Sequence, residues 1–319
     1  MLSKIALVAI LFVFCLAPAA VTSGQSRAPI TGEWRIEFAR KNPDEVQLNM
    51  TRGRQNNWGN GIKISEVQGL SRDYATTAAA NVTMRIVRDA GTFELTGSFS
   101  NGKGEGRFTL TPNDSFFSAL AARGYTSLSE NQVFSAAMSG LKLSSIDELK
   151  SAGYDQLTFD NLIESAIFKI TAASIADLRS VGFDHLPFQK LVEASIFKVD
   201  SSFVRETQNL GFGNLEFQKL VELRVHKITP EYINEVRGMG FNDLTLDRLV
   251  ELKIFKVTPE FVNEIRAAGF AAVTPQQLVQ LRIFKIDGDF ARKAKGSNPS
   301  ITVEDMVEQK IFEKRSSRD

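Results

Sequence analysis

Five lysines spaced at a constant interval are the most regular polar feature of the sequence. Neighbouring members lie 29 positions apart, and each stands between an aromatic residue or a histidine and a β-branched residue. The five residues are Lys169, Lys198, Lys227, Lys256 and Lys285. A row of ammonium groups could bind an anionic or acidic partner. A structural role is the alternative, because lysines near the end of a helix complement its dipole.

A row of acidic residues follows the same interval. Its members are Glu148, Asp177, Glu206, Glu235 and Glu264. Exposed ion pairs contribute at most about 1 kcal/mol and need no functional reason. The acidic row therefore favours the structural interpretation of the lysines, which are kept as candidate binding residues.

Residues suited to covalent or metal chemistry are few. The chain has two histidines, His185 and His226, and one cysteine, Cys15. His226 occupies the repeat position that phenylalanine holds elsewhere, so we interpret it as a substituted ring. No nucleophile elbow, phosphate-binding glycine loop or calcium loop is present in the sequence. We therefore expect no enzyme, no metal centre and no cofactor.

Trp58 is a second candidate for binding. The sequence predicts a loop over residues 52–61, in which Trp58 stands among glycines and amides. An exposed tryptophan could stack on a sugar or anchor a partner. The alternative is that its ring caps the open end of a β-layer.

Residues 1–24 predict a secretory signal peptide. Lys4 precedes an apolar run over residues 5–16, and small residues follow. A retained N-terminal anchor is the alternative, although the run is short for a membrane span. Cleavage between Ala19 and Gln25 would leave no cysteine and hence no disulfide. We expect a periplasmic or extracellular protein without a membrane span, and the net charge of +1 argues against a nucleic-acid partner.

Residues 31–111 alternate apolar with polar side chains, which predicts an antiparallel β-domain. The predicted strands cover residues 34–38, 46–50, 82–87, 92–96 and 106–110. Asp89-Ala90-Gly91 and Asn101-Gly102-Lys103-Gly104 supply residues suited to tight turns. The strand order does not follow from the pattern, so a small sandwich and a small barrel both remain open.

Residues 112–313 predict a tandem repeat of two helices in 29 residues. A glycine followed by an aromatic residue marks each unit, from Gly124-Tyr125 to Gly269-Phe270. Thr229 and Thr258 are placed to cap the first helices, and the glycines suit a left-handed helix end. In the second helices we expect Ile167 and Ile254 on the buried face. Single units are too small to be stable alone, which predicts an α-solenoid and an α+β protein overall. Residues 314–319 predict a disordered tail.

The repeat resembles the extracytoplasmic helical-repeat tails of bacterial beta-lactam-sensor-type membrane metallopeptidases, and free-standing secreted relatives of unknown role. In those repeats, the counterpart of Phe255-Lys256 is commonly His-Gly, whereas His226-Lys227 retains half of that pair. The segments over residues 88–93 and 104–108 also look like the region that precedes those repeats. The resemblance implies a bacterial cell-envelope protein and no activity, because the paired histidines of the metallopeptidase helix are absent from this sequence.

The sequence thus favours an exported, non-catalytic binding or scaffold protein that presents a helical-repeat surface to a protein partner at the cell envelope. The alternative is a glycan- or small-ligand-binding β-domain near Trp58, with the repeats as a spacer. A hydrolase that uses carboxylates alone is a third possibility, and it would need a deep cleft with paired acids.

The repeat interpretation predicts that units depend on their neighbours. A fragment of residues 171–228 should not unfold cooperatively as a monomer, since its apolar faces lose the adjacent units. Circular dichroism during urea denaturation, together with sedimentation analysis, measures this. Cooperative unfolding of a monomeric fragment would contradict the prediction.

Overall fold

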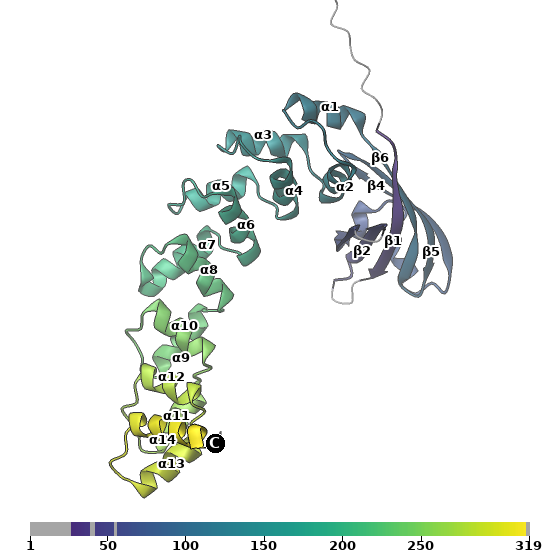
Figure 1. Ribbon diagram of the computed structural model, residues 1–319. Helices are drawn as coiled ribbons and strands as arrows, with labels where there is room; N and C mark the ends of the chain where they lie inside the picture. Colours follow the sequence, from purple (N-terminus) through teal and green to yellow (C-terminus); the bar gives the residue numbers. More distant parts are fainter. Residues whose placement is uncertain (1–26, 39–41, 54–55, 317–319) are drawn as a thin grey trace, which may run out of the picture. The chain divides into compact units, whose positions relative to one another are not determined.

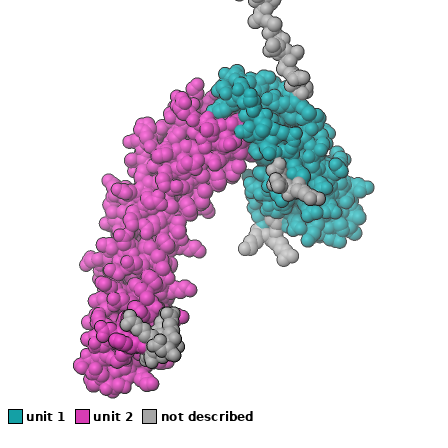
Figure 2. Space-filling view, viewed as in Figure 1, with its two compact units in different colours: residues 1–138 teal, residues 139–319 magenta. Residues whose placement is uncertain are grey.

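The computed structural model describes residues 27–38, 42–53 and 56–316. The predicted signal peptide lies outside the described residues, and so do positions 317–319 of the predicted tail. The chain divides into two compact units, residues 1–138 and 139–319, drawn in teal and magenta in Figure 2. The last strand ends at Pro112, before the boundary between the two units. The two helices that follow this strand belong almost entirely to the first unit. None of the described helices is long and apolar enough to cross a membrane.

Unit 1 is built on one antiparallel sheet of six strands. The strands are β1 (Ile30–Phe38), β2 (Glu45–Arg52), β3 (Asn56–Lys63), β4 (Ala80–Arg88), β5 (Gly91–Ser100) and β6 (Lys103–Pro112). Their order is β3-β2-β1-β6-β5-β4, so the first and last strands pair in the middle of the sheet. The five predicted strands are confirmed. Within the described part of the chain there is neither a second sheet nor a pairing of β3 with β4 that would close a barrel.

Alternation along the strands places one set of side chains in the core, including Trp34, Ile36, Leu48 and Met84. Both predicted turns are confirmed: the chain passes from β4 to β5 through Asp89 and Ala90, and from β5 to β6 through Asn101 and Gly102. Asn101 and Gly102 have φ of 49° and 81°, which matches the positive φ values that two-residue hairpins require.

The expectation of a loop over residues 52–61 was wrong, because most of that segment is the edge strand β3. Trp58 pairs with Met50 of β2 and is half-buried. The glycines and amides that indicated a loop lie on this edge, where a strand needs few packing side chains. Two short helical turns, η1 (Ile64–Glu66) and η2 (Arg72–Ala75), connect β3 to β4. Gln68 pairs with Arg85 and covers part of the other edge.

Two helices, α1 (Asp114–Ala122) and α2 (Glu130–Ser139), follow the sheet. The Phe134 ring of α2 stacks on Phe108 with centroids 5.8 Å apart and meets Phe93 edge-on at 5.9 Å. The guanidinium of Arg52 lies 5.1 Å from the centroid of Phe134 and pairs with Glu130. Helix α2 therefore completes the core of unit 1.

Unit 2 contains helices only, as far as it is described (Figure 1). They are α3 (Leu143–Ser151), α4 (Phe159–Ile167), α5 (Ala172–Arg179), α6 (Phe188–Phe197), α7 (Ser201–Thr207), η3 (Gln208–Phe212), α8 (Phe217–Val225), α9 (Pro230–Gly238), α10 (Leu246–Ile254), α11 (Pro259–Ala267), α12 (Pro275–Ile283), α13 (Gly288–Ser297) and α14 (Val303–Ser316). Helix α14 thus includes the first residues of the segment predicted to be disordered.

Packing in unit 2 joins several helices to the next but one along the chain. Contacts of this kind link α3 to α5, α4 to α6, α6 to α8, α10 to α12, α11 to α13 and α12 to α14. The predicted caps are present: Thr229 and Thr258 accept hydrogen bonds from the amides of Tyr232 and Phe261. The glycines that end the first helices have φ between 89° and 100°, from Gly124 to Gly269, as predicted.

The aromatic cluster beneath α2 generates a prediction for unit 1. The Phe134→Ala substitution should lower the free energy of unfolding by about 3–5 kcal/mol, because it leaves a cavity between two buried rings. The Phe312→Ala substitution is the matched control, since the Phe312 side chain is 64 % exposed and its loss should change stability by under about 0.5 kcal/mol. Urea denaturation followed by circular dichroism measures both, and equal losses would contradict the packing described.

Candidate binding surface

All five candidate lysines adopt the left-handed backbone conformation, with φ between 52° and 56°. Each follows the C-terminus of a second helix, in α4, α6, α8, α10 and α12. At α10 the amide of Lys256 donates to the carbonyl of Lys253 at 3.2 Å, and the amide of Val257 donates to Leu252 at 2.9 Å. These two bonds define a Schellman motif, in which the left-handed position is usually glycine. The lysines therefore occupy a position that glycine normally holds.

The same motif explains a wrong expectation about the second helices. Ile167 and Ile254 were expected on the buried face, but they are 43 % and 49 % exposed. In a Schellman motif the residue after the left-handed one packs against the residue five positions earlier. At α10 these are Val257 and Leu252, which are 2 % and 0 % exposed. Ile254 lies between them in sequence and points away from the core.

The exposed residue recurs in every second helix of the array from α4 to α12. The aliphatic row consists of Ile167, Ile196, Val225, Ile254 and Ile283, with exposed fractions of 43–49 %. Each member lies two positions before one of the five lysines, which we call the lysine row. Single exposed apolar residues are ordinary, but an exposed aliphatic side chain at the same position of five successive sequence repeats forms a regular pattern. Covering a half-exposed side chain of this size contributes about 1 kcal/mol.

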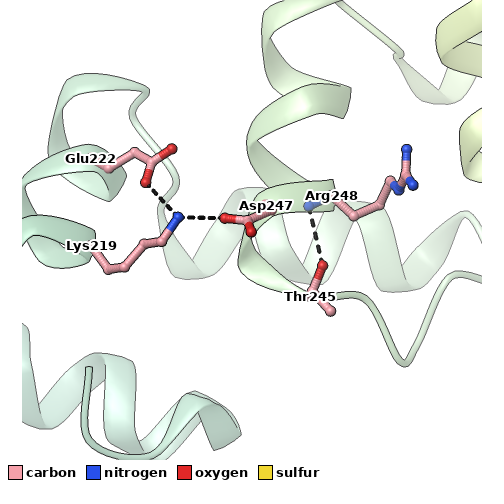
Figure 3. A network of polar contacts seen from close by, with 5 residues as sticks. All are labelled: Lys219, Glu222, Thr245, Asp247 and Arg248. Carbon is pink, nitrogen blue, oxygen red and sulfur yellow. Dashed lines mark hydrogen bonds and ion pairs between the residues drawn. The ribbon is translucent and has the colours of Figure 1, made fainter. Parts of the chain in front are cut away.

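The lysine row is exposed, and no member forms an ion pair among the residues that the structure describes. Three other cations of the second helices, Lys190, Lys219 and Arg248, form ion pairs. The Lys219 ammonium lies 2.9 Å from Glu222 and 2.5 Å from Asp247 of the next second helix (Figure 3). Hydrogen bonds to Asp247 and Glu222 raise the pKa of Lys219 above its ordinary value. Lys190 pairs with Glu193 and Arg248 pairs with Glu251 in the same way.

Two members of the acidic row, Asp177 and Glu264, contact the beginning of the following first helix. Both carboxylate oxygens of Asp177 accept hydrogen bonds from Ser201, at 2.6 Å from the hydroxyl and 2.8 Å from the amide. These bonds to Ser201 hold the pKa of Asp177 below its ordinary value. At α13 a Cβ on Gly288 would lie 2.9 Å from the Cβ of Glu264, so the two residues are in close contact. These acids stabilise the positive end of a helix dipole.

A shallow groove of about 260 Å³ lies between two successive lysines. Lys169 and Lys198 line it, Leu178 and Leu191 contribute apolar surface, and Asp177 contributes its carboxylate. The structure thus brings two members of the lysine row to one groove. Trp58 belongs to unit 1 and takes no part in it.

The two histidines remain separate from any convergent set of polar groups. His226 is half-buried at the C-terminus of α8, and His185 is exposed in the turn between α5 and α6. Among the described residues no three His, Cys, Asp or Glu side chains are placed to hold a metal ion. Comparison with known proteins finds no matching protein-family model, no matching curated protein and no matching solved structure.

The left-handed backbone of the lysine row predicts that substitution by glycine changes the free energy of unfolding in opposite directions at positions 256 and 150. Lys256→Gly should raise the free energy of unfolding by about 0.5–1 kcal/mol, since left-handed backbone costs a non-glycine residue about 1–2 kcal/mol and glycine loses part of that gain to entropy. Lys150→Gly, within helix α3, should lower it by about 0.5–1 kcal/mol. Thermal and urea denaturation of the full chain measure both. A loss of stability at position 256 equal to that at position 150 would contradict the assignment.

Proposed function

We propose that the chain is an exported, non-catalytic binding protein, in which an α-solenoid of 29-residue, two-helix repeats presents the lysine row and the aliphatic row to a protein partner at the cell envelope. The observation that carries the proposal is the coincidence of the two rows. Both follow the same interval, both are exposed, and each lysine is two positions from an aliphatic residue.

The solenoid is supported by contacts that repeat from unit to unit. Arg179, Arg237 and Arg266 each donate to a carbonyl 27 positions earlier, at the end of the preceding first helix, at 2.6, 3.1 and 2.7 Å. Such contacts join neighbouring units rather than distant parts of the chain, as expected for stacked repeats. Repetition also extends a surface along the array, so one weak contact per unit adds to a substantial interface.

The exposed aliphatic row supports a protein partner rather than a small anion. A phosphate or a carboxylate alone would be bound by cations and amides and would gain nothing from isoleucine side chains. Protein interfaces combine an apolar centre with a polar rim. The two rows supply an apolar and a charged component two positions apart in each repeat, and no catalytic step is assigned to them.

Export is supported by the sequence of residues 1–24, with its lysine, apolar run and small residues. A partner at the cell envelope follows from that address.

A second candidate function is the binding of a glycan or small ligand near Trp58. The observation in its favour is that the half-buried indole lies on β3, which is an edge strand of the sheet. Titration of tryptophan fluorescence with envelope polysaccharides tests it. Because Trp34 is 1 % exposed, a change in emission would be assigned to Trp58 and checked with Trp58→Phe.

The proposal predicts that polar substitution of three members of the aliphatic row weakens partner capture. The triple variant Ile196→Gln, Val225→Gln and Ile254→Gln should weaken binding roughly 100-fold, from about 1 kcal/mol lost at each half-exposed residue. Affinity capture from the envelope fraction, followed by quantitative mass spectrometry, compares the variant with the unmodified chain.

The control for this experiment is Val87→Gln, which removes an aliphatic side chain that is 52 % exposed on β4 of unit 1. Circular dichroism should show that all variants are folded. If the triple variant captured the same proteins in the same amounts as the unmodified chain, the aliphatic row would not be the binding surface.

A further inference from the structure

We infer that the partner presents an acidic protein segment with aliphatic side chains, whose carboxylates bind the lysine row while its apolar side chains cover the aliphatic row. This inference rests on the proposed function and adds the chemistry of the partner. It depends on the charge balance on the two sides of the aliphatic row.

On the N-terminal side of the aliphatic row three carboxylates are already paired. Glu193, Glu222 and Glu251 lie three positions before a row member, and each pairs with a cation of its own helix. Lys219 also reaches Asp247 of the next second helix, which extends this balance between units (Figure 3). An incoming cation would have to displace these pairs to reach the carboxylates. The neighbouring cations Arg224, Lys253 and Arg282 lie over the rings of Phe203, Tyr232 and Phe261.

On the C-terminal side the charges are not balanced in the same way. Lys198, Lys227 and Lys256 are exposed, and within the described chain no carboxylate lies within ion-pair distance of any of them. Left-handed backbone fixes where each lysine leaves the helix, so the ammonium groups recur once in each unit. An incoming carboxylate could pair with a lysine without breaking a contact of the chain.

The negative charges of the acids that line the groove between Lys169 and Lys198 are stabilised by groups other than these two lysines. Asp177 is hydrogen-bonded through both oxygens to Ser201, and Asp200 accepts from the amide of Phe203 at 2.9 Å. Both carboxylates therefore lie at the N-terminus of α7, where the helix dipole favours negative charge. Arg205 adds a positive charge next to Asp177, as its guanidinium donates to the Ser201 hydroxyl at 3.0 Å. The lysines are thus the charges that this side offers to a partner.

A polyanion without apolar groups fits the surface less well. Nucleic acids and charged polysaccharides would pair with the lysines but leave the aliphatic row in water. An acidic segment with isoleucine, leucine or valine satisfies both rows at once. Its affinity should fall stepwise as successive lysines are reversed, because each unit contributes one cation.

The test is a selection of random 16-residue peptides displayed on phage, with the full chain as the immobilised target. Enriched peptides are synthesised with a fluorescent label, and their dissociation constants are measured by anisotropy. We expect enrichment of Asp and Glu together with Ile, Leu and Val. Binding should weaken at least tenfold in the variant Lys198→Glu, Lys227→Glu and Lys256→Glu, and also in Ile196→Gln, Val225→Gln and Ile254→Gln.

Two controls keep the result specific. Lys150→Glu reverses an exposed lysine on α3 outside the row and should leave binding unchanged. A peptide with its acids replaced by lysine should bind the triple Lys→Glu variant at least tenfold better than it binds the unmodified chain. Glutamate is no worse than lysine in left-handed backbone, so the Lys→Glu variants change charge and leave the turn intact.

The outcomes separate this inference from the proposed function. Neutral or basic peptides that still require the aliphatic row would overturn the acidic partner and leave the binding surface in place. Peptides insensitive to both triple variants would count against both proposals. Polyglutamate that bound as tightly as the selected peptides, with no effect of the Ile→Gln variant, would overturn a partner that uses both rows.

Discussion

The left-handed turn that ends each helix is the constraint on which the rest of unit 2 depends. After the first helices the turn is made by glycine, with φ between 89° and 100°, and after the second helices by lysine, with φ between 52° and 56°. In both places the amide of the residue after the left-handed one donates back across the turn, from Tyr154 to Leu149 and from Val257 to Leu252. The chain can therefore reverse direction in a few residues and begin the next helix at a defined cap.

The turn also determines which side chains face solvent. The residue after each lysine packs inward, whereas the isoleucine or valine two positions before the lysine is exposed. Glycine would be less strained than lysine at this position. The binding function that we propose would give the five lysines a role beyond the turn, in spite of that strain.

Local structure was predicted correctly from the sequence wherever a pattern is compatible with only one type of structure. Strand alternation, hairpin turns, threonine caps and glycine ends are determined by neighbouring residues, and each was placed correctly. It failed at Trp58, because glycines and amides are as compatible with an edge strand as with a loop. The prediction was wrong at Ile167 and Ile254, because helical periodicity does not show where a Schellman motif ends the helix. In that motif the residue after the left-handed one makes the last buried contact. The left-handed conformation of Lys256 was also not predicted, because lysine as a residue type does not indicate positive φ. Its fixed place before a buried β-branched residue could have indicated the end of a helix.

Variation among the units shows how the stacking contacts substitute for one another. Arg179, Arg237 and Arg266 bridge to the preceding unit, but the equivalent position holds Gln208, whose amide donates to Asn214 instead. In that unit the first helix ends in the wider turn η3, and Arg205 donates to both Ser180 and Ser201. The junction between α5 and α7 is therefore held at the beginning of the helix rather than at its end. At these four junctions different residues supply the polar bridge between successive first helices, so these contacts tolerate sequence change while the exposed rows keep their interval.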